Sequence, residues 1–263
     1  MKHSLPLTLF LVPLLVSAHV LASPAEAIHV LFVGNSYIYA DDIPWITTRL
    51  AASEGGPKML EVELIALPGA TLQNHWERGN VVRRLQSGHW NYVVLQEQSS
   101  VPIESPELLR KYARLFDQEI KKAGAATVLF LTWPRRQHPE NLAALTNAYF
   151  ATAQELGAVV APVGMAWGDV LNEKSSIRLY HEDGSHPGPI GSYVASCILY
   201  SVFFDRSPVG LPGTLFTVRS QGLHARVGEL SKEDAALIQR AAWRCVRNTR
   251  RTSAASSVIG ERP

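Results

Sequence analysis

The stretch Leu31–Tyr37, LFVGNSY, decides how the rest of the chain can be interpreted. Apolar residues typical of a buried strand run into a Gly-Asn-Ser turn, which places the hydroxyl group of Ser36 at the end of the strand. Far downstream, in the segment DGSHP, Asp183 and His186 stand three residues apart. These residues supply a nucleophile, a base and a carboxylate that orients the base. The combination indicates hydrolysis through a serine nucleophile.

Short apolar runs of the kind that form buried strands recur along the chain. They span Ile28–Val33, Leu60–Leu67, Tyr92–Leu95, Thr127–Leu131 and Ala158–Val160. Between them, amphipathic segments with helical spacing cover Ile43–Ala52, Leu108–Lys122 and Leu142–Leu156. Because apolar strands that alternate with helices form parallel sheets covered on both faces, the pattern predicts an α/β fold. About five parallel strands indicate a flavodoxin-like three-layer α/β/α sandwich.

The chain continues with another apolar segment, Ile190–Phe204, which we expect to form a buried helix on the sheet. Asp205–Gly228 is rich in proline and glycine and predicts a surface excursion. A capping-box pattern at Ser231–Asp234 opens a last helix. These elements complete a single domain over residues 28–251, followed by a flexible tail over residues 252–263.

The first 27 residues have the three parts of a secretory signal peptide. Lys2 provides the positive start, Leu5–Leu15 is an apolar run broken by prolines, and small residues suitable for cleavage follow between about residues 22 and 27. The run is too short for a typical membrane-spanning helix. We therefore expect an exported protein, secreted or periplasmic, that keeps no stable membrane span after cleavage.

Composition narrows the classes of protein to which the chain can belong. The 263 residues are 46% hydrophobic, enough for one large core, and the formal net charge is +2. No run of basic residues is interleaved with aromatic ones, so we expect no nucleic-acid partner. The two cysteines, Cys197 and Cys245, could form a disulfide in an exported protein. Because both fall in predicted helices, two separate buried thiols are the favoured interpretation.

Polar residues at the strand ends supply the other groups that the chemistry needs, since open α/β sheets form their sites at the carboxyl ends of the strands. Attack by Ser36 creates an oxyanion that requires hydrogen-bond donors. The main-chain N–H of Ser36 is one candidate, and that of Gly69, after the second strand, is another. A third candidate is a side-chain amide after the third strand. Gln96 is the natural choice and Gln98, with the same side-chain parity, is the alternative.

The remaining histidines predict no metal site. His75, His138 and His181 have no second partner at a spacing typical of metal ligands, so we interpret them as structural or rim residues. The chemistry that Ser36 and His186 imply needs no cofactor, and we expect none.

Taken together, the motifs resemble those of the SGNH hydrolases, the GDSL-type esterase and lipase superfamily, in a poorly characterised bacterial branch. The resemblance covers roughly residues 28–206 and rests on four blocks in the superfamily's order. The blocks read Gly34-Asn35-Ser36, Gly69, the region of Gln96, and Asp183-Gly184-Ser185-His186. The third block departs from the pattern, because the usual Asn is absent. There Leu95–Ser99, LQEQS, is similar to the Tyr-Gln-Gly-Glu-Ser of sialate and xylan acetylesterases, in which a Gln stands in for the Asn; this favours Gln96.

The resemblance implies an exported serine esterase that hydrolyses small acyl esters, acetyl above all, on a carbohydrate. Ser36 would be the nucleophile, His186 the general base and then acid, and Asp183 the residue that orients the imidazole. Two alternatives stay open. One is a glycan-binding module with little turnover, and the other is an enzyme that transfers the acyl group to a sugar acceptor with the same residues.

Aromatic and basic side chains near the strand ends are candidates for the rim of the substrate site. We expect two of five aromatic residues to reach the pocket: Tyr37, Tyr39, Trp45, Trp76 and Trp133. Tyr37 and Trp133 are the preferred pair, and Arg135 is the basic residue that would favour a polar or acidic substrate.

Overall fold

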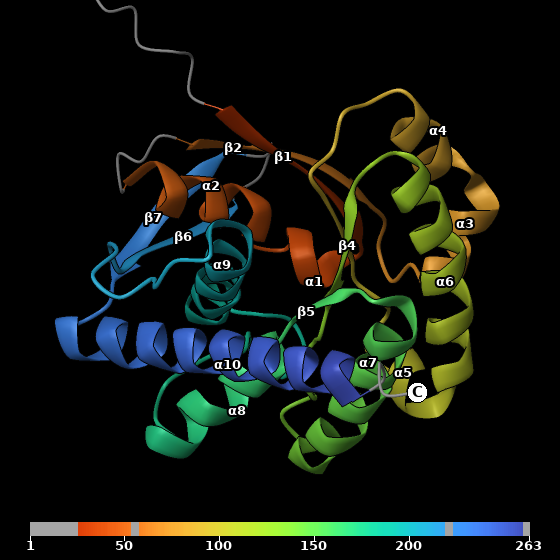
Figure 1. Ribbon diagram of the computed structural model, residues 1–263. Coiled ribbons are helices and arrows are strands. Elements are labelled where there is room, and N and C mark those ends of the chain that lie inside the picture. The colour runs from red at the N-terminus through yellow and green to blue at the C-terminus, as the bar shows by residue number, and fades with distance from the viewer. Residues whose placement is uncertain (1–25, 54–57, 219–222, 260–263) are drawn as a thin grey trace, which may run out of the picture.

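The structure, a computed structural model, describes residues 26–53, 58–218 and 223–259. Residues 1–25, which form most of the predicted signal peptide, lie outside the described residues. A five-stranded parallel sheet forms the centre, in the order β2-β1-β3-β4-β5 (Figure 1). Its strands are β1 (Glu26–Gly34), β2 (Lys58–Ala66), β3 (Tyr92–Leu95), β4 (Ala126–Phe130) and β5 (Val159–Ala161). This is the flavodoxin-like strand order.

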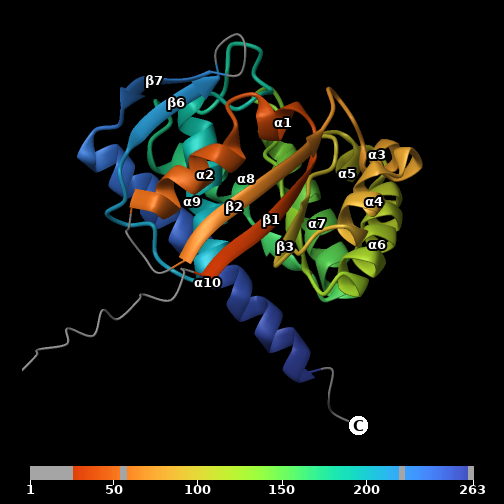
Figure 2. The same cartoon turned by 90° about the horizontal axis from the view of Figure 1, so that it is seen from above.

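Helices cover both faces of the sheet, so the predicted three-layer sandwich is confirmed (Figure 2). One face carries α2 (Ile43–Ser53), α8 (Val163–Glu173), α9 (Pro189–Phe204) and α10 (Lys232–Ile259). The other carries α3 (Leu72–Arg78), α4 (Asn80–Gln86), α6 (Pro106–Lys122) and α7 (Leu142–Leu156). Short helices α1 (Ser36–Tyr39), α5 (Val101–Glu104) and η1 (Pro139–Asn141) lie in the loops between these elements.

The burial of alternate residues of β1 explains why the strands are continuous apolar runs in the sequence. Val30 and Phe32 are buried in the cluster beneath α9, whereas Leu31 and Val33 are buried in the cluster beneath α6 and α7. Both faces of a central parallel strand are covered, and both therefore need apolar side chains.

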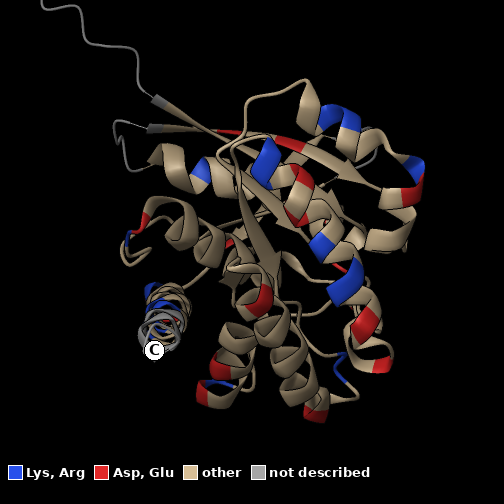
Figure 3. Cartoon of the chain, turned by 45° about the vertical axis from the view of Figure 1, so that its right-hand side comes forward, with Lys and Arg blue, Asp and Glu red and all other residues tan. Residues whose placement is uncertain are grey.

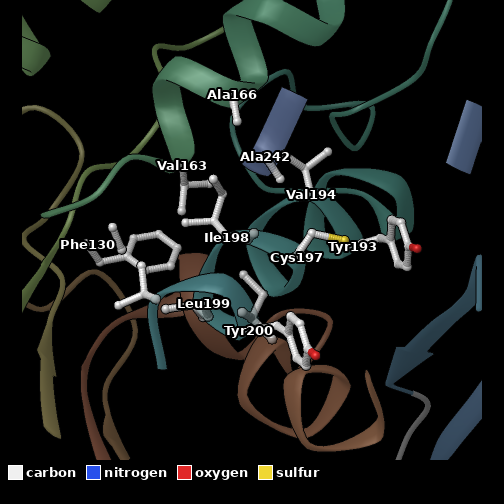
Figure 4. Close-up of a cluster of buried hydrophobic side chains, with 14 of the residues drawn as sticks. Phe130, Val163, Ala166, Tyr193, Val194, Cys197, Ile198, Leu199, Tyr200 and Ala242 are labelled. Atoms are coloured by element: carbon white, nitrogen blue, oxygen red, sulfur yellow. The ribbon is translucent and has the colours of Figure 1, made fainter. Parts of the chain in front are cut away.

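The α9 helix is the most deeply buried of the helices that pack on the sheet. Figure 4 shows its side chains among residues of β4, α8 and α10. A Cβ atom on Gly191 would lie 2.3 Å from the main-chain oxygen of Leu179 and 2.4 Å from the ring of Trp167, so the close approach here requires glycine. Cys197 in α9 and Cys245 in α10 are both free and buried, as the favoured interpretation expected.

The predicted surface excursion contains an unexpected antiparallel hairpin, formed by β6 (Thr214–Val218) and β7 (His224–Glu229). The hairpin lies beside α2, where the Trp45 ring stacks on His224 and meets Phe216 edge-on. The last helix, α10, also continues to Ile259, beyond the start of the flexible tail expected from residue 252.

Basic residues of α10 are partly neutralised by neighbouring helices. Arg244 forms ion pairs with Asp169 and Glu173, and Arg250 pairs with Asp205. Figure 3 shows both signs of charge along the outer helices. Within the described residues, the helices are all too short or too polar to cross a membrane.

Candidate active site

Ser36 lies at the carboxyl end of β1, where the strand turns directly into α1. Asn35 caps this helix, because its Oδ1 accepts the N–H of Tyr37 at 3.1 Å. Gly34 is needed just before the turn, since a Cβ atom there would lie 2.4 Å from Oε1 of Gln96. The sharp turn leaves the Ser36 side chain at the edge of the sheet, where it is only half-buried.

Asp183 and His186 reach Ser36 from one loop, residues 180–188, which we call the His186 loop. Main-chain bonds close its base, from His181 N to His186 O at 3.0 Å and from Gly188 N to Leu179 O at 2.8 Å. Nδ1 of His186 lies 2.5 Å from Oδ2 of Asp183, and its Nε2 lies 2.8 Å from Oγ of Ser36. The structure therefore brings the three predicted residues into one hydrogen-bonded series.

The charge on Asp183 is fixed by its hydrogen bonds. Desolvation by partial burial raises its pKa, but bonds from the His186 ring and from the N–H groups of Ser185 and His186 outweigh this and lower the pKa to about 2. The carboxylate is thus ionised at neutral pH. It can hold a proton on Nδ1 of His186, which leaves Nε2 free to accept a proton from Ser36.

The buried side chains of Tyr37 and Trp133 pack under the His186 loop and bond to Ser185 in it. Their rings stack with centroids 5.0 Å apart; the Tyr37 hydroxyl lies 2.5 Å from Oγ of Ser185, and Trp133 donates to the main-chain oxygen of Ser185 at 3.0 Å. Both side chains are buried, at 5% and 1% exposure. They do not form the exposed rim expected from the sequence, because their faces are used in packing. Arg136 braces the loop from outside, donating to the main-chain oxygens of Gly184 and Glu182.

Arg135, the basic residue predicted at the rim, is exposed. It lines a cavity of about 360 Å³ between the segments that follow β3 and β4, with Ser99, Glu104 and His138 among the other lining residues. Two of the other aromatic candidates serve elsewhere: Trp76 packs on Phe116 and Trp45 packs on the hairpin.

The sequence predicts that the main-chain N–H groups of Ser36 and Gly69 bind an oxyanion, and a hydrogen bond joins the two segments that carry them. Gly69 is exposed in the loop of residues 67–71, the Gly69 loop, and its φ of +62° favours glycine. Neither Ser36 N nor Gly69 N donates to another atom of the described residues. Asn35 joins the two segments, because its Nδ2 donates to the main-chain oxygen of Ala70 at 3.0 Å. The sequence analysis did not predict this bridge.

Gln96 does not face the exposed edge with Ser36, contrary to the role expected for it. The side chain is fully buried beneath the turn; Oε1 accepts the N–H of Asn35 at 2.8 Å and Nε2 donates to the main-chain oxygen of Glu97 at 2.5 Å. Both ends of the amide are thus used by the main chain. Gln98 is half-buried, and its Oε1 accepts the N–H groups of Ser100 and Val101 at the start of α5.

The other histidines have separate structural partners. His75 is buried with Nε2 2.8 Å from the main-chain oxygen of Gly34, and burial lowers its pKa. His181 lies 3.4 Å from Asp41, and His138 pairs with Glu140. The described residues include no group of three acidic, histidine or cysteine side chains placed to hold a metal ion.

Comparison with solved structures identifies the superfamily. A protein from Slackia heliotrinireducens, described as "a putative SGNH hydrolase", aligns with 28% sequence identity and a TM-score of 0.59 over 67% of this chain and 98% of that one. The chain belongs to the SGNH hydrolase superfamily. Like that protein, it has the fold of an SGNH/GDSL-type hydrolase.

This SGNH hydrolase shares its fold with more distant proteins. A DUF4886 family protein from Bacteroides uniformis aligns at 16% identity with a TM-score of 0.69, over 84% of this chain and 95% of that one. An acetyl xylan esterase aligns at 13% identity with a TM-score of 0.53, over 66% of this chain and 99% of that one. No family model and no curated protein matches the chain.

Proposed function

We propose that this SGNH hydrolase is exported and removes small acyl groups, acetyl above all, from carbohydrates. The observation that carries the proposal is the hydrogen-bonded series from Asp183 through His186 to Ser36, with contacts of 2.5 and 2.8 Å. Because the series is complete and ends at a half-buried hydroxyl group, it favours turnover over a glycan-binding module with an idle site.

The proposed reaction has two steps. Oγ of Ser36 attacks the ester carbonyl carbon while Nε2 of His186 takes the hydroxyl proton, and Asp183 stabilises the imidazolium. The N–H groups of Ser36 and Gly69 receive the negative oxygen. His186 then gives its proton to the leaving alcohol, which leaves an acyl group on Ser36. A water molecule, deprotonated by His186, attacks that acyl group and releases the carboxylic acid with the serine restored.

The carbohydrate part of the proposal rests on two supports. An acetyl xylan esterase and an acetyl-xylooligosaccharide esterase from Geobacillus have the same fold as this chain. Polar groups suited to sugar hydroxyls, from Ser99, Glu104 and Arg135, line the cavity between the segments that follow β3 and β4. Export rests on the N-terminal sequence alone, and sequencing the mature protein should find a start between about Ser23 and Ile28.

A chromogenic acetyl ester and a panel of acetylated oligosaccharides test the function. The wild-type protein should release acetate from both, and Ser36→Ala should lose nearly all turnover. Ser53→Ala, which changes an exposed serine on α2, is the matched control and should keep full activity. Binding of the oligosaccharides without release of acetate would instead identify a binding module. Acyl transfer to an added sugar in preference to water would identify a transferase.

A further inference from the structure

Glu97, two residues beyond β3, carries a carboxyl group that the proposed mechanism does not use. The side chain is 1% exposed. Oε1 accepts hydrogen bonds from the main-chain N–H groups of Leu72 at 3.1 Å and Gln98 at 2.7 Å. Oε2 has no partner among the described residues. A carboxyl group buried in this way is costly, so its presence calls for a reason.

The pKa of Glu97 reflects the free-energy cost of burying its carboxyl group. The buried hydroxyl group of Tyr149 lies close enough for the charge of Glu97 to act on it. Desolvation by burial raises the pKa of Glu97 to about 7, although its two main-chain hydrogen bonds lower it. Burial, and then the charge of Glu97, raise the pKa of Tyr149. What a carboxylate offers in return is a charge-assisted acceptor, roughly twice as strong as a neutral one.

The stronger acceptor holds the end of the Gly69 loop. Leu72 is the first residue of α3, directly after that loop, and its N–H has no acceptor within the helix. Closer to Ser36, the side chain of Asn35 donates a hydrogen bond to the main-chain oxygen of Ala70. Gly69 lies between these two points, in a turn that the N–H of Ala70 closes on the main-chain oxygen of Leu67 at 3.2 Å, and its own N–H donates to no atom of the described residues.

We propose that Glu97 is a positioning residue for the oxyanion hole, holding through Leu72 the loop from which Gly69 directs its N–H towards Ser36. The inference rests on the proposed function, because it takes Gly69 as an oxyanion donor. The donor interacts with the oxyanion mainly in the transition state, so a loosened loop should lower kcat and leave KM nearly unchanged.

Two substitutions at Glu97 separate the acceptor from the bulk of the side chain. Glu97→Leu removes both hydrogen bonds, and kcat should fall about 10²-fold, as for loss of an oxyanion donor. Glu97→Gln keeps a neutral acceptor at the same position and should lose less than about tenfold. Asp117→Leu is the matched control: Asp117 is another buried acid, on α6, that bonds Thr127 and pairs with Lys121, and its loss should lower stability without lowering kcat.

Hydrogen exchange measures the same claim without any turnover. The amides of residues 70–72, each hydrogen-bonded in the structure, should exchange faster in Glu97→Leu than in the wild type, and should be close to wild type in Glu97→Gln. This result does not depend on whether the protein is an esterase. Failure of the proposed function, seen as equal rates in wild type and Ser36→Ala, is therefore distinguishable from failure of the inference.

A second pair of variants serves if Glu97→Leu does not fold. Leu72→Pro removes the N–H that Glu97 holds; proline suits the first position of a helix, and Thr71 already has the extended ψ of 165° that precedes proline readily. Leu72→Ala shortens the same side chain but keeps the N–H. We expect Leu72→Pro to have the lower kcat by about tenfold or more. Unchanged exchange in Glu97→Leu, equal losses in Glu97→Gln and Glu97→Leu, or equal kcat in the two Leu72 variants would each overturn the inference.

Discussion

Replacing Asp183 with Asn tests the proposed triad sharply, because the structure fixes how the new amide must face. Oδ1 of Asp183 accepts the N–H groups of Ser185 and His186 at 2.9 and 3.0 Å, while Oδ2 meets Nδ1 of His186. An Asn side chain keeps these main-chain bonds only if its oxygen takes the place of Oδ1. Its NH₂ group then points at Nδ1, which must become an acceptor. The ring proton moves to Nε2, and Ser36 loses its base.

The size of the effect follows from the two main-chain bonds. Turning the amide over to restore the working tautomer would sacrifice both bonds, at about 1 kcal/mol each. A difference of about 2 kcal/mol disfavours the working arrangement roughly 30-fold. That bias alone lowers kcat about 30-fold, and the variant also lacks the carboxylate charge that stabilises the imidazolium. With both losses we expect kcat of Asp183→Asn to fall by about 10³ to 10⁴, as for other triads with this substitution, with KM little changed.

Initial rates on a chromogenic acetyl ester, with circular dichroism to verify folding, provide the assay. Glu182→Gln is the matched control, because it makes the same chemical change at an exposed neighbour in the same loop and should keep the wild-type rate. A folded Asp183→Asn protein that retains more than about a tenth of kcat would refute the tautomer argument and, with it, the role of Asp183.

Three further predictions concern buried groups. Since burial raises the pKa of Glu97 from 4.5 to about 7, the wild type should lose up to about 3 kcal/mol of unfolding free energy as pH rises through that range, and urea denaturation should find no such loss in Glu97→Gln. Cys197 and Cys245, whose pKa values burial raises to about 12, should resist iodoacetamide at pH 8 until the protein is unfolded; mass spectrometry would detect any earlier labelling. Gln96→Ala should cost about 3 kcal/mol in urea denaturation, because Asn35 N loses its acceptor; unchanged stability would contradict this.

The sheet could be predicted from the sequence because its strands are buried on both sides. Each of the five apolar runs falls on an observed strand within about two residues, as expected when burial rather than local propensity determines the pattern. The α8 helix was missed for the opposite reason. Gly164 and Gly168 lower its helix propensity, yet Gly164 is required, since a Cβ atom there would lie 2.2 Å from the main-chain oxygen of Thr132.

The hairpin shows a second limit of sequence reasoning. Proline and glycine mark residues 205–228 as irregular, but they do not reveal what the segment packs against. Its stability comes from contacts across the fold: Phe216 and His224 enclose Trp45, and Thr217 donates to Asp41. These partners lie more than 170 positions apart in the sequence, and a single sequence does not pair them.

The site itself was predictable where chemistry is local and unpredictable where a side chain's direction matters. Ser36, Asp183 and His186 sit in turns whose residues dictate the geometry, and the structure joins them as expected. Tyr37 and Trp133 were placed near the site correctly, but an aromatic ring at a strand end can face inward or outward. In this fold both rings face inward, beneath the His186 loop.

The inward direction of the Gln96 side chain could not be predicted either, and it changes which groups can bind the oxyanion. Parity along an extended strand would point Gln96 and Gln98 to one side, but β3 ends at Leu95 and the parity ends with it. Gln96 instead fills the space that Gly34 leaves by lacking a side chain. There its Oε1 holds Asn35, next to the Ser36 donor, and its Nε2 holds the main chain of the following residue, whose carboxyl group secures the Gly69 loop. The third block thus bonds to the neighbours of both proposed main-chain donors, and two well-held donors can serve an oxyanion without a side-chain amide.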